Sequence, residues 1–129
     1  MENDIKKSAE IIHNAGILLY PTDTIWGLGC DATNETAIEK INVLKQRPQT
    51  KNYIILVNSL AMLKAYVTSI PNCALQLINS AQKPLTIIYN DVQNLPLSAI
   101  AADKTAAGSV IAIDVGAVQP VVSSAKTTL

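Results

Sequence analysis

The chain has 129 residues, a length that fits a single domain with a real hydrophobic core. Hydrophobic residues make up 49% of it and charged residues 16%, and the formal net charge is zero. A neutral chain has no overall attraction for nucleic acid or for anionic membranes, so a site for a polyanion must be a local cluster of basic side chains.

The cysteines and the single histidine argue against several kinds of site. Cys30, Cys73 and His13 have no spacing typical of zinc binding, a disulfide framework or a histidine-based triad. Cys30 fits a small buried hydrophobe, and His13 fits a solvated surface residue. No apolar run approaches the roughly 20 residues of a membrane helix. We therefore expect a cytoplasmic protein without a metal site or a membrane segment.

Helical and strand signals alternate from the start of the chain. Apolar spacing predicts a helix over residues 4–14, with Gly16 as its C-terminal stop, and a short buried strand over residues 17–20. The side chain of Asn34 can cap a second helix, which Pro48 closes.

The second half of the chain continues this alternation. The apolar run at residues 53–57 is typical of a buried strand, Ser59 can cap the next helix, and Pro71 begins another. Three further strands are predicted at residues 85–89, 109–113 and 117–122. This order of elements indicates one twisted α/β domain.

A polar turn follows the first predicted strand. Pro21 ends that strand because it cannot donate a ladder hydrogen bond. Thr22, Asp23 and Thr24 then lie at the C-terminal end of the strand, where open α/β sheets bind ligands. The same residues also fit an ordinary Asx turn followed by a bulge, and both interpretations stay open.

Two glycines and a tryptophan continue this turn. Gly27 and Gly29 allow a positive φ or a close approach of a ligand to the main chain. Trp26 fits either the core or a stacking wall beside a ligand. Asp31 is expected to organise the turn before the second helix.

A basic cluster surrounds the end of the second predicted helix. Pro48 biases Arg47 out of the helical region, so Lys45 in the last turn and Arg47 can point to one place. With Lys51 they can surround a triphosphate. The alternative is that these cations only offset the helix macrodipole.

The segments 21–24, 26–31 and 45–48, in this order and spacing, resemble the YrdC/Sua5/TsaC family of threonylcarbamoyl-AMP synthases. The resemblance runs from about Ile5 to Ile88 and includes residues 83–86, Lys-Pro-Leu-Thr, which are similar to a family Gly-Pro-x-Thr motif. It implies a YrdC-like α/β fold over residues 1–129, a single domain with a twisted open mixed β-sheet flanked by helices.

The resemblance implies a definite reaction. Members of the family combine L-threonine, bicarbonate and ATP with Mg²⁺ to give L-threonylcarbamoyladenylate and pyrophosphate, a step towards the t6A modification of tRNA. Such a reaction depends mainly on positioning and on neutralising phosphate charge, so the lack of a catalytic histidine is no objection.

The resemblance also implies roles for individual residues. Lys45 and Arg47 are expected to be catalytic and, with Lys51, to bind the ATP phosphates. The residues expected to bind substrate are Thr22, Asp23, Thr24, Trp26, Lys51 and Thr86. Of these, the turn over 22–24 and Trp26 are expected to lie around L-threonine. Ser109 and Ser123 are expected to bind the nucleotide.

The C-terminal part departs from the family. Asp114 stands where the strand over 109–113 normally ends in an arginine, and Lys126 replaces the asparagine of a Ser-Thr-Ser-Ala-Asn motif. In addition, the usual Lys-Pro-Leu after the basic cluster is Lys51-Asn52-Tyr53. A carboxylate facing the triphosphate repels it unless it turns away or binds Mg²⁺. We expect a domain whose C-terminal part is incomplete relative to the family.

The sequence is therefore consistent with two functions. The first is the synthase, with an activity that these departures can impair. The second is a noncatalytic YrdC-like protein that binds nucleotide or double-stranded RNA, including tRNA, through Lys45, Arg47 and Lys51. The synthase releases pyrophosphate only with threonine and bicarbonate present, whereas RNA binding depends on salt and not on threonine. An unstable fragment with an unpaired sheet edge is a third interpretation.

Overall fold

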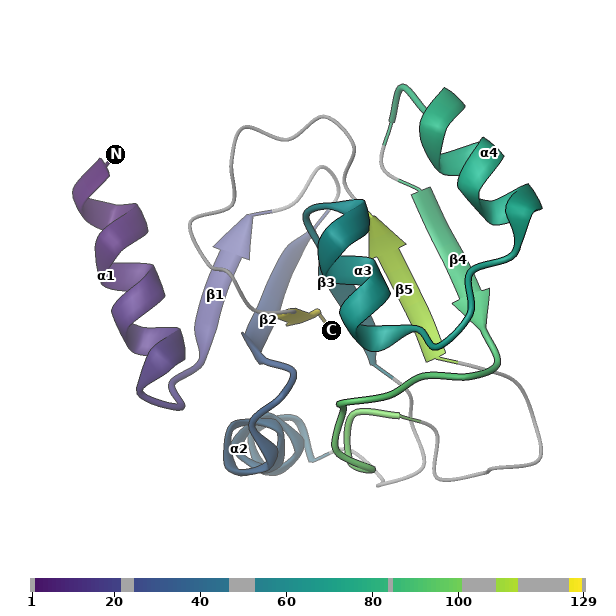
Figure 1. The fold of residues 1–129 in the computed structure, drawn as a ribbon. Coiled ribbons are helices and arrows are strands. Elements are labelled where there is room, and N and C mark those ends of the chain that lie inside the picture. The colour runs from purple at the N-terminus through teal and green to yellow at the C-terminus, as the bar shows by residue number, and fades with distance from the viewer. Residues whose placement is uncertain are drawn as a thin grey trace.

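We describe the protein from a computed structural model of the whole chain. It describes residues 2–21, 25–46, 53–83 and 85–100, together with the backbone of residues 109–113 and 126–128. These residues form helices around a six-stranded mixed sheet with the strand order β1-β2-β6-β3-β5-β4 (Figure 1). The predicted α/β class and mixed sheet are confirmed.

The first two strands form an antiparallel pair. β1 (Leu18–Pro21) lies against β2 (Trp26–Asp31), with Pro21 opposite Trp26 and Tyr20 opposite Gly27. The prediction that Pro21 ends the first strand is confirmed. The prediction of a continuous turn through Cys30 is wrong, because pairing with β1 holds residues 26–31 in an extended conformation despite the weak strand propensity of glycine.

The other strands come from the second half of the chain. β3 (Ile54–Val57) pairs in parallel with β5 (Ser109–Ile113), and β4 (Leu85–Tyr89) pairs antiparallel with the outer side of β5. β6 (Lys126–Thr128) pairs with both β2 and β3. The expected strands at 85–89 and 109–113 are confirmed, β2 and β6 were not predicted, and the strand expected at 117–122 lies outside the described residues.

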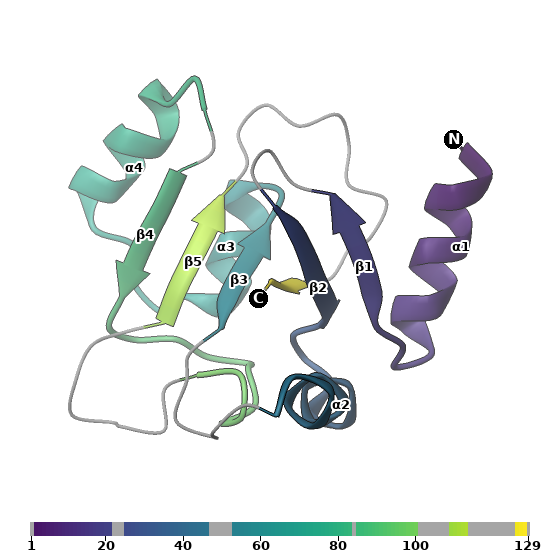
Figure 2. The same cartoon turned by 180° about the vertical axis from the view of Figure 1, so that it is seen from behind.

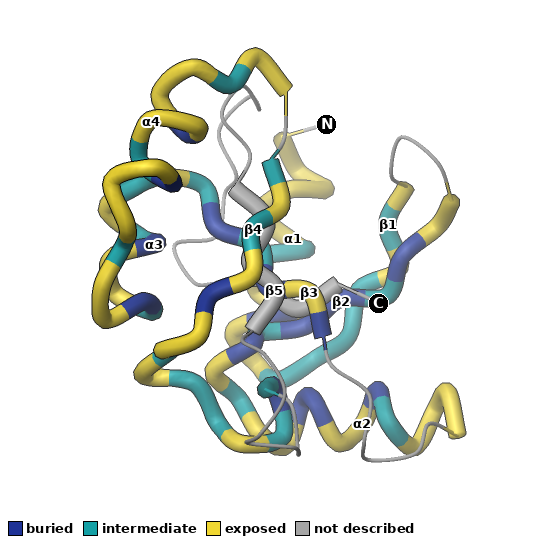
Figure 3. The backbone as a smooth tube through the Cα atoms, turned by 90° about the vertical axis from the view of Figure 1, so that its right-hand side faces the viewer, coloured by how far each residue is buried: buried dark blue, intermediate teal, exposed yellow. Residues whose placement is uncertain are grey.

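Among the described residues, four helices flank this sheet. α1 (Glu2–His13) lies beside the edge strand β1, and α2 (Glu35–Lys45) packs against β2 (Figure 2). α3 (Leu60–Tyr66) and α4 (Asn72–Ser80) lie together on one side of the sheet, over β3, β5 and β4 (Figure 3). None of the described helices is long and apolar enough to cross a membrane.

The predicted helix caps are present. Asn34 accepts a hydrogen bond from the Ala37 amide at 3.1 Å, and Ser59 accepts one from the Met62 amide at 3.2 Å. Each bond satisfies one of the amides that a first helical turn leaves without a partner. The helix after Pro71 is also confirmed, with Pro71 itself as the N-cap residue.

The end of α1 differs from the prediction. Ala15, and not Gly16, takes the left-handed conformation, with φ of 57°. The Ala15 amide donates to the Ile12 carbonyl at 3.1 Å and the Gly16 amide donates to the Ile11 carbonyl at 2.7 Å. These two bonds form a Schellman ending in which Gly16 is needed for the close approach to Ile11 and not for its φ.

The core lies between the sheet and its helices. Its fully buried side chains include Ile38 and Ile41 from α2, Ile55 from β3 and Leu63 from α3. Alternate side chains of β4 point to opposite faces of the sheet. Those that pack with this cluster are Leu85, Ile87 and Tyr89, whereas Thr86 and Ile88 are exposed on the other face. The side of β4 that points away from α3 and α4 is therefore open among the described residues.

Candidate functional site

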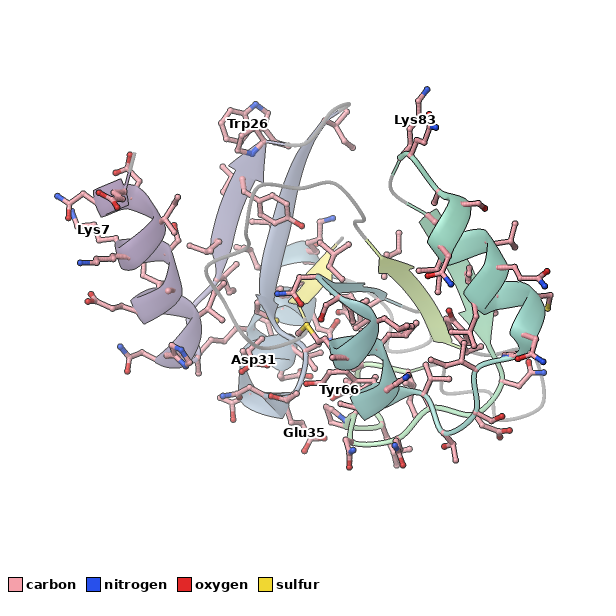
Figure 4. All side chains as sticks on the ribbon, turned by 45° about the horizontal axis from the view of Figure 1, so that its top comes forward. Lys7, Trp26, Asp31, Glu35, Tyr66 and Lys83 are labelled. Carbon is pink, nitrogen blue, oxygen red and sulfur yellow. The ribbon has the colours of Figure 1, made fainter. Side chains whose placement is uncertain are left out.

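The turn between β1 and β2 carries two exposed apolar side chains. Ile25 is 72% exposed and Trp26 is 65% exposed. Trp26 therefore is not a core residue, and it projects from the start of β2 at the outer end of the hairpin (Figure 4). Its position leaves the ring available as a wall beside a ligand. The neighbouring Thr22, Asp23 and Thr24 lie outside the described residues.

The basic cluster begins where α2 ends. Lys45 is the last residue of the helix and is exposed to solvent. Gln46 follows in the left-handed conformation, with φ of 50° and ψ of 42°, so the chain turns sharply away from the helix axis there. The helix therefore ends before Arg47, as predicted. Arg47 and Lys51 lie outside the described residues.

The ends of these two motifs lie on one side of the sheet. Figure 3 shows the β1–β2 hairpin and the C-terminal end of α2 extending to the same side, opposite to α3 and α4. Thr86 is exposed on the face of β4 that is turned away from the core, and so belongs to this side as well. The fold thus gives Trp26, Lys45 and Thr86 a shared side of the molecule.

The predicted nucleotide residues are not all close to Thr86. Thr86 pairs with Ala112, whereas Ser109 pairs with Tyr89 at the other end of β4. Three residues along a strand correspond to about 10 Å. The register therefore separates Ser109 from Thr86, and Ser123 lies outside the described residues.

Residues close to the turn have structural roles that the sequence indicated. The Asp31 carboxylate accepts hydrogen bonds from the Thr33 amide at 2.8 Å and the Thr33 hydroxyl at 2.6 Å, which organises the turn into α2. Cys30 is fully buried, and burial, followed by the nearby charge of Asp31, raises the pKa of its thiol to about 12. His13 is exposed, as expected.

Two residues that sequence reasoning missed connect α2 with β3. The Tyr53 hydroxyl donates a hydrogen bond to the Asn42 side-chain oxygen. Tyr53 is only 3% exposed, and it stands directly before β3. The signal that could have found this pair is the tyrosine itself, which stands where the family resemblance leads to a leucine.

A hollow on the outer side of α2 is separate from these motifs. Its volume is about 820 Å³, and Ile17 and Ser98 contribute to it from outside the helix. The residues of α2 that line it are Glu35, Thr36, Glu39, Lys40, Val43 and Leu44. Within the described part of the chain, no group of three or more His, Cys, Asp or Glu side chains could hold a metal ion.

The described elements define an α/β domain built on one mixed sheet. The Sua5/YciO/YrdC family model, which carries the description "Telomere recombination", matches residues 10–115. The chain therefore belongs to the Sua5/YciO/YrdC family. The family resemblance inferred from the sequence motifs is confirmed.

A curated relative supports the same family. A protein of Acinetobacter baumannii (strain ATCC 17978), named threonylcarbamoyl-AMP synthase, is 40% identical over 72 residues, which cover 56% of this chain and 38% of that protein. A protein of the same name from Hydrogenovibrio crunogenus is 41% identical over 63 residues, covering 49% of this chain and 34% of its own length. The matched part thus spans less than two fifths of these relatives.

Solved structures share the fold. The structure of P. abyssi Sua5 complexed with L-threonine has a TM-score of 0.75 at 20% identity and covers 100% of this chain and 38% of its own. E. coli YciO has a TM-score of 0.73 at 22% identity and covers 100% of this chain and 64% of its own. The described residues therefore share the YrdC-like architecture of these structures.

Proposed function

We propose that the protein is an L-threonylcarbamoyladenylate synthase, which converts L-threonine, bicarbonate and ATP into threonylcarbamoyl-AMP and pyrophosphate. The observation that carries this proposal is the pair of motifs at residues 21–31 and 45–48, in a chain of this family. The name of the 40%-identical relative and the threonine complex of P. abyssi Sua5 support it. The product would serve the t6A modification of tRNA.

The proposed site lies on the side of the sheet that α3 and α4 leave open. Lys45, Arg47 and Lys51 bind the phosphates of ATP, and Trp26 forms a wall beside threonine. Thr22, Asp23, Thr24 and Thr86 supply polar contacts to the amino acid, and Ser109 and Ser123 belong to the nucleotide side. The exposure of Lys45, Trp26 and Thr86 on one side of the molecule supports this arrangement.

The chemistry fits a site without a strong general base. The carbamate formed from threonine and bicarbonate attacks the α-phosphorus of ATP, the bond from that phosphorus to the bridging oxygen breaks, and pyrophosphate leaves. Cations at the end of α2 offset the charge that builds up on the leaving group. Formation of the carbamate from the neutral amine and bicarbonate releases one water. The carbamate is then already anionic, so its attack on the α-phosphorus requires alignment and no removal of a proton.

Mg²⁺ enters this proposal as part of the MgATP substrate. The described residues provide no cluster of carboxylates for it. Mg²⁺ bound to nucleotides commonly keeps several waters and is held largely by phosphate oxygens. We therefore assign no residue of the described chain to the metal.

The test is a titration of the purified protein with MgATP, with and without L-threonine and bicarbonate. Binding is followed by heat and turnover by pyrophosphate release in the same sample. Pyrophosphate that appears only when all three substrates are present supports the synthase. A folded protein that binds none of them contradicts it.

A second candidate is a noncatalytic YrdC-like protein that binds nucleotide or double-stranded RNA. Asp114 favours it, because a carboxylate in place of a phosphate-facing arginine repels the triphosphate. Binding of MgATP without turnover, or of a tRNA hairpin with a steep salt dependence and no effect of threonine, would support this candidate.

A further inference from the structure

One residue of α2 contacts the chain where it enters and where it leaves the basic segment, residues 46–52. The backbone amide of Gln46, where the chain leaves the helix, donates to the carbonyl of Asn42 and, at 3.2 Å, to that of Val43. The side-chain oxygen of Asn42 accepts the hydroxyl of Tyr53, where the chain returns to the sheet. Asn42 therefore contacts Gln46 at the start of the segment through its backbone carbonyl, and Tyr53 just after the segment through its side chain.

The amide group of Asn42 is itself held in one orientation. Its nitrogen donates to the Glu39 carboxylate at 3.4 Å, which turns its oxygen towards Tyr53. Tyr53 belongs to the buried core cluster, so its ring is fixed by packing and its hydroxyl needs a partner. The contact thus joins an ordered residue of α2 to an ordered residue before β3.

From these contacts we propose that Asn42 and Tyr53 are positioning residues that tie together the two ends of the basic segment at residues 46–52. This inference rests on the proposed function, which assigns Arg47 and Lys51 of that segment to the ATP phosphates. It adds residues that touch no substrate but hold the phosphate-binding cations in place.

The physical reason is the cost of ordering. Ordering a chain segment on ligand binding brings a loss of conformational entropy, and residue 52 is asparagine, a residue type that does not fix φ as proline does. Fixing both ends of a short segment removes part of that loss before binding. Preorganisation of this kind raises affinity without adding a contact to the ligand.

The experiment compares ATP affinity in Tyr53→Phe, Asn42→Ala and the double variant by calorimetry. Tyr53→Phe keeps the core ring and removes only the hydroxyl. We expect each single variant to weaken ATP binding roughly three- to tenfold, which is the effect of about one hydrogen bond, and the double variant to be no weaker than either. Affinity for L-threonine should not change. Tyr66→Phe, the same deletion on α3, is the matched control.

A rescue variant makes the test specific. Adding Asn52→Pro to Tyr53→Phe restores backbone restriction by another route, so ATP affinity should return towards that of the unchanged protein. Unchanged ATP affinity in Tyr53→Phe, or a loss that Asn52→Pro does not recover, would overturn the positioning role.

Limited trypsin cleavage supplies a readout that does not need ATP binding. Tyr53→Phe should speed cleavage after Lys45 and Lys51 severalfold and leave cleavage after Lys7 on α1 and Lys64 on α3 unchanged. Equal acceleration at all four sites, or none, would contradict a local tie. If the unchanged protein fails to bind ATP, the proposed function fails, while the cleavage pattern still decides whether the tie exists.

Discussion

The amide of Gly16 donates a hydrogen bond to the carbonyl of Ile11 at 2.7 Å, and a Cβ on Gly16 would lie 2.4 Å from the Cγ2 atom of Ile11. The same Cβ would lie 2.6 Å from the Ile11 carbonyl oxygen, which is backbone and has little room to shift. The end of α1 therefore has no space for a side chain at this position, although the φ of Gly16 is ordinary.

Gly16→Ala is expected to destabilise the protein by about 1–3 kcal/mol, the range typical of overpacking. Urea denaturation followed by circular dichroism measures this loss. Ala15→Gly is the neighbouring control and should act in the opposite direction by about 0.5–1 kcal/mol, because Ala15 carries the left-handed φ of 57°. Equal losses in both variants would exclude the close approach of Gly16 to Ile11 as the cause of the destabilisation.

Asn34→Ala should remove the cap of α2 and cost about 0.5–2 kcal/mol. The bond lost joins the Asn34 side chain to the Ala37 amide at 3.1 Å. Asn34→Asp keeps an acceptor at the same place and should retain most of the stability. Thermal melts of the two variants decide the matter, and a drop in Tm as large for Asn34→Asp as for Asn34→Ala would exclude capping as the reason.

The buried thiol of Cys30 should make stability fall at alkaline pH. Burial raises its pKa from 9.0 to about 12, so in the unfolded state the thiol loses its proton at lower pH. The stabilisation is fully present below about pH 9 and is lost as the pH rises towards 12, because over that range the unfolded state binds fewer protons. Cys30→Ala should flatten this fall in the free energy of unfolding, while Cys73→Ala, at an exposed position, should leave it unchanged.

Lys45→Ala is expected to lower ATP affinity about ten- to hundredfold, the effect of one charge-assisted hydrogen bond. Lys64→Ala is the matched control, because Lys64 is also exposed in the last turn of a helix. Both changes remove a favourable helix-dipole interaction and should cost less than about 1 kcal/mol of stability. If calorimetry finds the two variants equal in ATP affinity, Lys45 serves only the macrodipole.

Asp114→Arg should strengthen ATP binding and make it more sensitive to salt, because it replaces a repelling charge with an attracting one near the triphosphate. Asp91→Arg makes the same charge change at an exposed position in the described loop after β4. Titrations at two salt concentrations compare the variants. A gain shared by both would be a general effect of net charge and would remove Asp114 from the site.

Much of the local structure follows from the sequence because its causes are local. The strands at 85–89 and 109–113 have the predicted bounds, and the capping roles of Asn34 and Ser59 follow from side chains that reach their own helix within three residues. The motifs at residues 21–31 and 45–48 were also visible in sequence, because residue type and spacing carry the family resemblance. The family match over residues 10–115 bears this out.

Other features depend on contacts between distant segments. Gly27 and Gly29 allow several conformations by themselves, and only pairing with β1 makes their segment a strand. The order of the strands places β5 between β3 and β4, so these two strands, which follow each other in the sequence, do not lie next to each other in the sheet. The hydrogen bond from Tyr53 to Asn42 joins two residues 11 positions apart, and the tyrosine by itself does not identify its partner. The sequence by itself determined the helices, most of the strands, the caps and the family. The tertiary structure decided β2, β6, the strand register, the exposure of side chains and the contact between Tyr53 and Asn42, because these depend on which surfaces meet once the chain has folded.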